Sequence, residues 1–262
     1  MNSPLPVAAY QMATAFDVRE NARKIHEAID ECAAGHSRLL VTPECALSGY
    51  LPPPDLDFDL LRELEAEIVA HAADADLYLA LGTTTERNGD WLNTAKLFSP
   101  TGRPLATYDK TELTGADKGV FAPGKDLPVF EIGNWTVGLQ ICFDMRFPEN
   151  WRILRQQGAT VILHLSSASR SSGWKVPVLE GTIRCRAAEN GMFVVSANDA
   201  REPQMLVSAI CDPVGKHLAH AEENREMIIE ATLDASELTE EYLSCRRTDL
   251  WNRPEYRRLL LE

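Results

Sequence analysis

Residues 137–149 read Val-Gly-Leu-Gln-Ile-Cys-Phe-Asp-Met-Arg-Phe-Pro-Glu, an apolar run that passes into a charged turn. The branched apolar residues predict a buried strand, and the amphipathic stretch that follows predicts a sharp bend and then a helix. Cys142 stands at that bend, where a rigid strand can hold its sulfur toward a cleft. Most free cysteines are small buried hydrophobic residues, so this stretch alone leaves both interpretations open.

Two other reactive side chains stand at the ends of predicted strands. Residues 38–42 form a short apolar run that is soon followed by Glu44, and the strand predicted over 105–108 is closed by Lys110. Open α/β sheets bind ligands at the carboxyl ends of their strands, which favours a functional site here. Singly, each residue has a plainer interpretation, as a loop carboxylate or a solvated lysine. With Cys142 they place an acid, a base and a thiol at equivalent positions.

A thiol flanked by an ammonium and a carboxylate is equipped for acyl transfer. The thiolate is the reactive form of cysteine, whose ordinary pKa is about 8.5. A neighbouring ammonium lowers that pKa, and a carboxylate within hydrogen-bond reach accepts the proton. The ammonium and a backbone N–H, such as that of Phe143, then stabilise a tetrahedral oxyanion. These residue types therefore favour attack on the carbonyl carbon of a carbon–nitrogen bond.

The rest of the chain alternates strands with amphipathic helices. Helices are predicted over residues 18–34, 56–73, 147–157, 177–190 and 234–242, the first of them capped by Asp17. Strands are predicted over residues 5–11, 38–42, 76–84, 92–99, 105–108, 129–132, 135–142, 159–165, 192–197 and 226–233, with two more inside 206–220. This pattern, without repeats or linkers, predicts one α/β domain over 1–262, with mixed sheets inside and helices outside.

Composition and charge exclude several classes of partner. With 45% hydrophobic and 25% charged residues, the chain has an ordinary globular composition. Its net charge of −13 disfavours nucleic acid. No stretch approaches the roughly 20 apolar residues of a membrane span, and the N-terminus lacks the features of a signal peptide. We therefore expect a cytoplasmic protein that binds neither nucleic acid nor membrane.

The cysteine pattern favours reduced thiols. The six cysteines are Cys32, Cys45, Cys142, Cys185, Cys211 and Cys245. None forms a Cys-x-x-Cys pair, and their spacings are wide and irregular. In a chain of this length we expect six free thiols and no zinc site.

Three motifs together resemble those of the nitrilase superfamily of carbon–nitrogen hydrolases, in its amidase branches. They are Pro43-Glu44, Tyr108-Asp109-Lys110 and the run from Cys142 to Glu149, in the family's order, with a further match over Arg184–Asn190. The resemblance covers about residues 5–260 and is nearest to ω-amidases, deaminated glutathione amidases and N-carbamoyl amidases. Several distant motifs in one order are far more specific than any one of them.

The resemblance implies a fold and a mechanism. The fold is a four-layer αββα sandwich that pairs into a homodimer or a higher homo-oligomer, with the C-terminal arm 246–262 docking on a partner subunit. The catalytic triad has Glu44 as general base, Lys110 as oxyanion stabiliser and Cys142 as nucleophile. The reaction passes through a cysteine thioester and releases ammonia, and it needs no metal and no organic cofactor.

One position departs from the family's pattern. Relatives commonly carry a glutamate four residues before the phenylalanine of a Phe-x-Pro-Gly turn, which is Phe121 here. That position is Asp117, whose side chain is shorter by one methylene. Asp117 is therefore a candidate second carboxylate with a shorter reach. Glu112 at the other end of the loop is the alternative, and a solvated loop acid is the third interpretation.

Five residues are candidates for binding the substrate. Tyr50 stands in a rigid aromatic loop expected over the mouth of the site, although a plain surface loop would look the same. Arg170, Trp174 and Lys175 are expected to line the substrate side, where they could receive a carboxylate; an exposed loop is the alternative. Glu180 is expected either to orient the pocket or to be an acid on the helix surface.

Three functions are compatible with these residues. The leading one is an amidohydrolase acting on a small linear amide or an N-carbamoyl compound. The second is a nitrilase acting on a C≡N group, although nitrilases are usually longer. The third is an inactive interaction protein with the same fold. A papain-like protease is not supported, because no histidine stands in a partner position and His164 is expected to be a hydrogen-bonded core residue.

Overall fold

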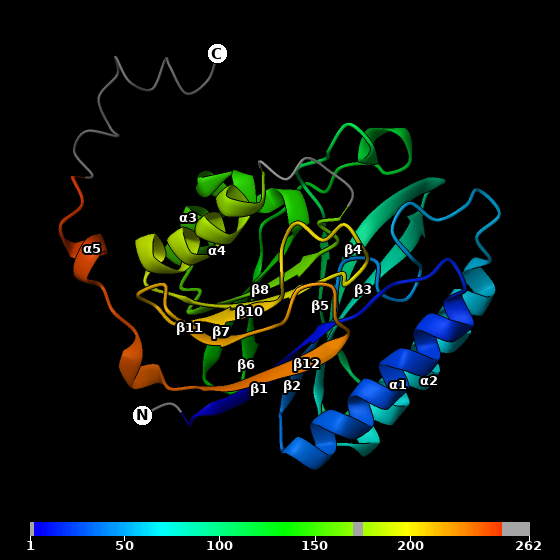
Figure 1. Ribbon diagram of the computed structural model, residues 1–262, viewed down its shortest axis with the longest axis horizontal. Helices are drawn as coiled ribbons and strands as arrows, with labels where there is room; N and C mark the ends of the chain where they lie inside the picture. Colours follow the sequence, from blue (N-terminus) through cyan, green and yellow to red (C-terminus); the bar gives the residue numbers. More distant parts are fainter. Residues whose placement is uncertain (1–2, 170–174, 248–262) are drawn as a thin grey trace.

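Two six-stranded sheets stack face to face between two layers of helices in the computed structural model, which describes residues 3–169 and 175–247 (Figure 1). The first sheet has the order β12 (Met227–Leu233), β1 (Leu5–Gln11), β2 (Leu39–Val41), β3 (Tyr78–Arg87), β4 (Asp90–Phe98), β5 (Pro104–Asp109). The second has the order β11 (His217–His220), β10 (Ala209–Cys211), β9 (Phe193–Asn198), β8 (Val161–Ser166), β7 (Trp135–Ile141), β6 (Val129–Ile132). Each sheet combines parallel and antiparallel pairs, so the predicted mixed sheets are confirmed.

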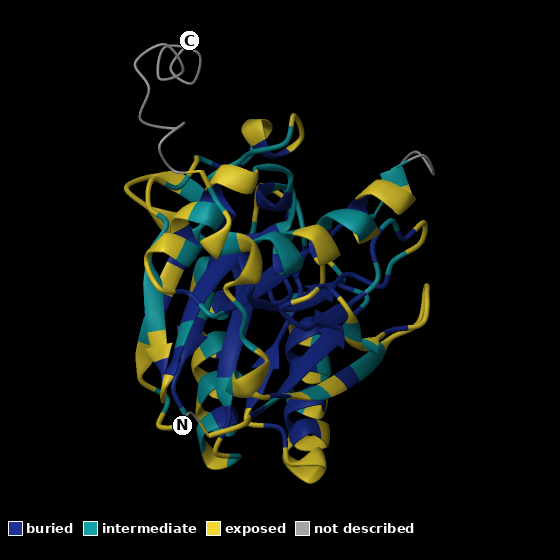
Figure 2. Ribbon diagram, turned by 90° about the vertical axis from the view of Figure 1, so that its left-hand side faces the viewer, coloured by how far each residue is buried: buried dark blue, intermediate teal, exposed yellow. Residues whose placement is uncertain are grey.

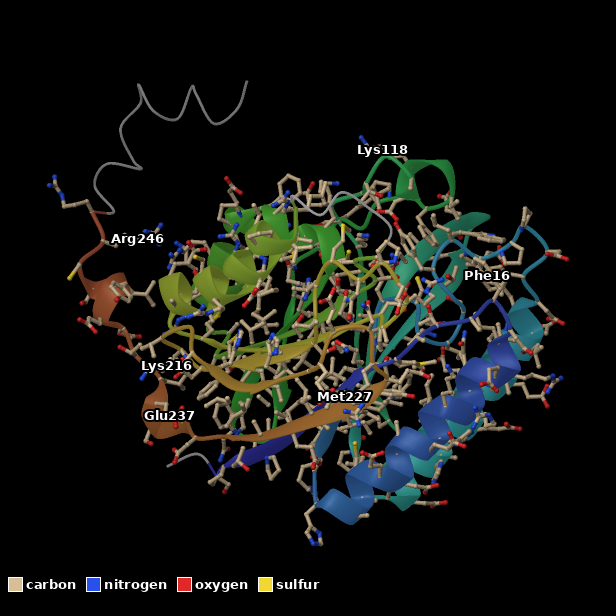
Figure 3. All side chains as sticks on the ribbon, in the orientation of Figure 1. Phe16, Lys118, Lys216, Met227, Glu237 and Arg246 are labelled. Carbon is tan, nitrogen blue, oxygen red and sulfur yellow. The ribbon has the colours of Figure 1, made fainter. Side chains whose placement is uncertain are left out.

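Helices α1 (Val18–Gly35) and α2 (Phe58–Asp74) cover the outer face of the first sheet, and α3 (Pro148–Gln156) and α4 (Val176–Asn190) cover that of the second. The layers are therefore αββα, as the resemblance implied. Figure 2 shows the buried residues concentrated in the strands, with exposed residues on the outer faces of the helices. Side chains fill the space between the layers (Figure 3).

The strands are apolar on both faces because each face packs against another layer. Along β1, Val7 and Ala9 belong to the core between the two sheets, while Ala8 and Tyr10 belong to the core beneath α1 and α2. Successive residues of a strand point to opposite faces, so strands buried on both faces appear as continuous apolar runs. This is why the sequence shows short apolar runs rather than a polar–apolar alternation.

Strand ends bring distant parts of the chain to one place. Strands β7 and β8 pair in parallel, with Ile141 opposite Leu165, so that both end beside Cys142. The turn after β2 lies tightly against β3: a Cβ at Gly82 would stand 2.0 Å from the carbonyl oxygen of Pro43. Only glycine permits that approach.

One predicted helix differs from the structure. Residues 234–242 form a short 3-10 turn, η4 (Ala235–Glu237), and then a separate one-turn helix, α5 (Glu241–Ser244). Asp234 caps the first turn by accepting from the Ser236 N–H, and Leu238 then takes an extended conformation that ends it. Of the predicted C-terminal arm, only Arg246 and Arg247 are among the described residues. Within the part of the chain that the structure describes, no helix is long and apolar enough to cross a membrane.

Candidate active site

Cys142 begins the 3-10 helix η2 (Cys142–Arg146) directly after β7, which confirms the predicted bend. Its φ of +46° lies in the left-handed region, a strained conformation for a residue with a side chain. The Asp144 carboxylate braces the bend by accepting from the Ile141 N–H at 2.8 Å, the Glu112 N–H at 2.9 Å and the Tyr108 hydroxyl at 2.7 Å. Several fixed contacts therefore maintain the strained cysteine.

His164 supports the same bend from beneath. The ring is fully buried, with Nε2 3.1 Å from the Cys142 carbonyl oxygen and Nδ1 2.9 Å from the Ser196 hydroxyl. Burial lowers the pKa of His164 to about 4, so the ring is neutral at physiological pH. It contacts the cysteine backbone and not the thiol, which confirms the predicted core histidine. Arg186 adds a further brace by donating to the Met145 carbonyl oxygen at 3.0 Å.

Glu44 is fixed by donors from three separate segments. Its Oε1 accepts from the Lys110 ammonium at 2.7 Å and from the Asn93 amide at 2.7 Å, and its Oε2 accepts from the Ser167 N–H at 2.8 Å. The carboxylate is only 1% exposed. Asn93 also accepts from the Lys110 backbone N–H at 2.9 Å, so one residue of β4 positions both the glutamate and the lysine.

Lys110 lies between two carboxylates. Its ammonium donates to Glu44 at 2.7 Å and to Asp117 at 2.9 Å, and it stands 5.8 Å from the centre of the Tyr50 ring. Burial alone would lower the pKa of Lys110, but Glu44, Cys142 and Asp117 raise it well above its ordinary value. The side chain is therefore a permanent cation that cannot serve as the base.

Asp117 reaches the lysine despite its shorter side chain. It is fully buried in η1 (Asp117–Gly119), where it accepts from Lys110, from the Thr114 N–H at 2.8 Å and from the Tyr50 hydroxyl at 2.8 Å. The tight turn from Thr114 brings the backbone closer, which compensates for the missing methylene. Burial raises the pKa of Asp117, but these contacts bring it below its ordinary value. The expectations of a shorter reach or a solvated acid were wrong, and Glu112 instead binds Asp144 through its backbone.

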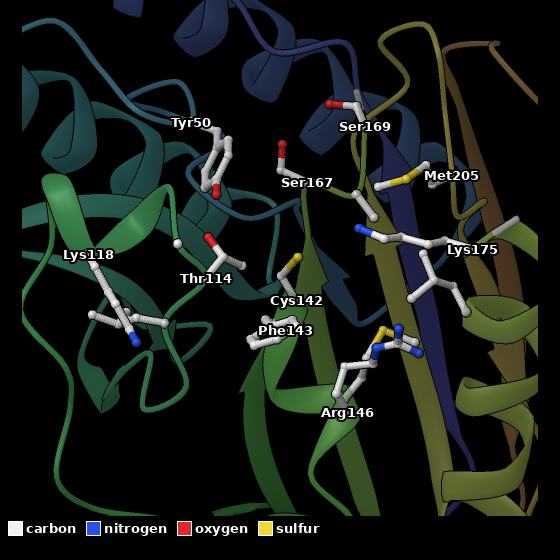
Figure 4. A pocket seen from close by; sticks show the side chains of 15 residues that line it. Tyr50, Thr114, Lys118, Cys142, Phe143, Arg146, Ser167, Ser169, Lys175 and Met205 are labelled. Carbon is white, nitrogen blue, oxygen red and sulfur yellow. The ribbon is translucent and has the colours of Figure 1, made fainter. Parts of the chain in front are cut away.

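A cavity of about 530 Å³ opens beside the cysteine (Figure 4). Figure 4 shows the Cys142 sulfur pointing into it, between Tyr50 and Ser167. Glu44 and Lys110 lie beneath this lining, fully buried. Burial raises the pKa of Cys142 to about 12; the charge of Glu44 raises it further and that of Lys110 opposes the rise. The resting nucleophile is therefore a neutral thiol with a carboxylate and an ammonium nearby.

The predicted substrate-binding residues divide into three groups. Tyr50 and Lys175 line the cavity, and Figure 4 shows the amine end of Lys175 extending into it. Arg170 and Trp174 lie outside the described residues. Glu180 is exposed on the outer side of α4 and does not line the cavity, so its expected role in orienting the pocket was wrong. One turn of the helix turns residue 180 away from the face that Leu179 presents.

Sequence reasoning missed Asn93, Ser167 and Asp144. Asn93 and Asp144 are fully buried, and the Ser167 contribution is a backbone N–H that no side-chain pattern reveals. A polar residue within an apolar strand, as at Asn93, was the available signal, since buried polar groups need partners.

A thiol at a strained turn, above a buried glutamate–lysine–aspartate network in an αββα sandwich, defines a hydrolase with a cysteine nucleophile. Comparison with known families then identifies which kind. The chain matches the carbon–nitrogen hydrolase family over residues 6–241 and belongs to that family. It is a nitrilase-superfamily enzyme of the amidase branch, with Cys142 in the expected catalytic position.

Individual relatives agree with this assignment. The chain is 33% identical to a hydrolase encoded in the pqqF 5′ region of Pseudomonas protegens, covering 94% of this chain and 90% of the relative. It is 31% identical to an (R)-stereoselective amidase of Pseudomonas sp. (94% and 93% covered) and 26% identical to the omega-amidase NIT2 of Homo sapiens (89% and 90%). An amidase of Nesterenkonia sp. AN1, solved as an active-site variant with acrylamide, superimposes with a TM-score of 0.83 at 25% identity, covering 95% and 96%.

Proposed function

We propose that this enzyme hydrolyses the carbon–nitrogen bond of a small linear amide or N-carbamoyl compound through a thioester on Cys142, releasing ammonia. The observation that carries the proposal is the buried network of Glu44, Lys110 and Asp117 beneath a cavity that Cys142 lines. The amidase relatives support the amide class.

In the first half of the reaction, Glu44 accepts the thiol proton as the Cys142 sulfur attacks the carbonyl carbon. The oxyanion that forms is stabilised by the Lys110 ammonium and by the Phe143 N–H, which lies in the first turn of η2, where a helix leaves its N–H groups without internal partners. Glu44 then gives the proton to the leaving nitrogen, the carbon–nitrogen bond breaks, and ammonia departs. The acyl group remains on sulfur as a thioester.

In the second half, water attacks the thioester carbonyl carbon while Glu44 accepts a proton from it. The same two donors stabilise the second oxyanion. The carbon–sulfur bond breaks, the sulfur regains its proton from Glu44, and the carboxylic acid leaves. Asp117 keeps the Lys110 ammonium in place throughout through its 2.9 Å ion pair. Because Lys110 stays a cation, Glu44 is the group that moves protons.

Basic side chains of the cavity favour a substrate with a carboxylate at the far end. Lys175 and Arg146 both line the cavity with Cys142, while Leu179 and Met205 supply apolar surface between them. An ω-amide of a short dicarboxylic acid would place its amide carbon at the sulfur and its carboxylate near these cations. Among the amide substrates, this class is therefore preferred.

Ammonia release from a matched panel tests the proposal. The panel contains a neutral short amide, the ω-amide of a dicarboxylic acid, an N-carbamoyl amino acid and the nitrile that corresponds to the neutral amide. We expect turnover of the ω-amide, lost in Cys142→Ala. Lys175→Met should raise KM for the charged amide and leave the neutral amide unchanged. Turnover of the nitrile alone would favour the nitrilase alternative, and no turnover of any compound would contradict the proposal.

We also propose that residues 1–262 form one domain that works as a cytoplasmic homodimer. Six free cysteines support a reducing compartment. Ile153 and Tyr242, which are 40% and 61% exposed, line a broad second hollow beside α3 and α5, a surface suited to a second copy. Sedimentation should give twice 29.1 kDa, and Ile153→Glu should give the monomer. A wild-type monomer at micromolar concentration would contradict the dimer.

A further inference from the structure

Two histidines at the edge of the second sheet stack against each other. The rings of His217 and His220 on β11 have their centroids 4.8 Å apart and an interplanar angle of 25°. Residues three apart in a regular strand point to opposite faces. Here the β10–β11 register shifts, with Cys211 opposite His217 and Ala209 opposite His220. This bulge puts both rings on one face of the sheet.

That face is the one covered by α4. Ala209 and Cys211, the partners of the two histidines, belong to the core beneath α3 and α4. Glu180 of α4 completes a cluster in which one ligand atom from each of the three residues lies within 4.8 Å of the other two. It is the one group of three or more potential metal ligands found among the described residues. Figure 1 shows α4 lying over this part of the sheet.

The two elements that carry these side chains are fastened together independently of them. Arg184 of α4 donates to the Gly215 carbonyl oxygen in the β10–β11 turn at 2.8 Å. Gly215 has a φ of +81°, and a Cβ there would stand 2.8 Å from the Arg184 carbonyl oxygen. The turn therefore packs directly on the helix, and the three side chains need only rotate to converge.

We propose that Glu180, His217 and His220 form a binding site for a divalent transition-metal ion, with Zn²⁺ as the representative ion. Two imidazole nitrogens and one carboxylate oxygen are a common zinc donor set, with water in the fourth position. Tetrahedral ligands at zinc lie roughly 3.4 Å apart, so the cluster closes by about one ångström through side-chain rotation. Cysteine spacing alone had predicted no zinc site, and the bulge that pairs the histidines is not visible in the sequence.

The bound ion would clamp α4 to the β10–β11 hairpin. Glu180 follows Leu179, which lines the substrate cavity, so the clamp lies on the outer side of the cavity wall. The ion takes no part in hydrolysis, because it lies on the face of α4 that points away from Cys142. Its expected effect is on stability, since any ligand that binds only the folded state raises Tm.

Calorimetric titration of the metal-free full chain with ZnCl₂ tests this site. Exposed Cys185 and Cys245 are replaced by serine in every protein compared, because their thiols would compete for zinc. We expect one ion per chain and a rise in Tm. His217→Ala with His220→Ala should weaken Kd by about 100-fold or more, and Glu180→Gln by about 10-fold.

A second stacked pair supplies the matched control. His26 on α1 and His71 on α2 have their ring centroids 5.0 Å apart, and His26→Gln should leave zinc binding unchanged. The proposal would be overturned by an unchanged isotherm in the double histidine variant, by equal loss in the His26 control, or by no saturation below millimolar zinc. Glu180→Gln keeps the test decisive if the double variant does not fold.

Discussion

Cys45 and Cys142 are two thiols that share the charges of Glu44 and Lys110. Both have a positive φ, +51° and +46°, and burial raises the pKa of both above the ordinary cysteine value. Cys45, however, is completely buried and accepts a weak hydrogen bond from Thr84, whereas Cys142 is partly exposed and lines the cavity.

The comparison shows that neither strain nor nearby charge is enough to make a thiol reactive. The same carboxylate and the same ammonium act on both sulfurs. What separates them is the opening to the cavity, together with the donors of η2 that follow Cys142. Access therefore decides which thiol does chemistry.

The largest effect should come from exchanging the two cysteines one at a time. Cys142→Ala should lower kcat for the preferred amide by at least about 10⁴-fold, because the nucleophile is removed. Cys45→Ala should retain activity within several-fold and lose about 1–2 kcal/mol of unfolding free energy through a small cavity. Ammonia release and denaturant melts measure both. Equal loss of activity in the two variants would end the distinction.

Removing the shared cation should come next. Lys110→Met leaves Glu44 and Asp117 buried and unpaired, so we expect a loss of about 3–5 kcal/mol in unfolding free energy and about 10³-fold in kcat. Lys96→Met is the matched control, because Lys96 pairs with Glu65 near the surface. That change should cost about 1 kcal/mol or less and spare activity. Similar losses in both variants would contradict the account of Lys110.

A smaller effect is expected from Asp117→Asn. The amide keeps the size of the carboxylate but removes the charge that holds the Lys110 ammonium. We expect kcat to fall by about 10- to 100-fold, less than the loss of an oxyanion donor itself. Asp117→Glu, which restores the acid that relatives commonly carry, should recover most of the activity. No recovery with glutamate, or full activity with asparagine, would refute the positioning role.

The smallest expected signal concerns ionisation. Because the pKa of Cys142 is raised to about 12, its thiol stays protonated in neutral and mildly alkaline solution. The far-ultraviolet thiolate absorbance of wild type and of Cys142→Ala should therefore coincide up to about pH 9, and the same holds for Cys45→Ala. A difference that titrates below the ordinary cysteine value of about 8.5 would show a preformed thiolate instead.

Sequence reasoning predicted the layers because strand and helix patterns are local. The bounds of β1, β6 and α1 follow from apolar runs and from the Asp17 cap, which accepts from the N–H groups of Arg19 and Glu20. Glu44, Lys110 and Cys142 could be singled out because all three follow strand ends. The split of the last predicted helix was missed because one cap and one extended residue decide it.

Long-range packing explains what was missed at the site. The Asn93 amide and the Ser167 N–H reach Glu44 across 49 and 123 residues of sequence, and no local pattern predicts such pairs. The reach of Asp117 depends on the turn at Thr114, not on side-chain length. Glu180 was misplaced because the spacing gives its helix, but not which side of that helix faces the cavity.

Covalent labelling with fluoroacetamide tests the central claim most directly. A structure of the related Nesterenkonia amidase shows covalent addition of the acetamide moiety of this compound at the active-site cysteine. If the Cys142 sulfur is the nucleophile that the buried glutamate and lysine activate, intact-mass and peptide mass spectrometry should find one adduct, on Cys142, and Glu44→Gln should label more slowly. An adduct on Cys45 or on the exposed Cys185, or no adduct on Cys142, would contradict the account.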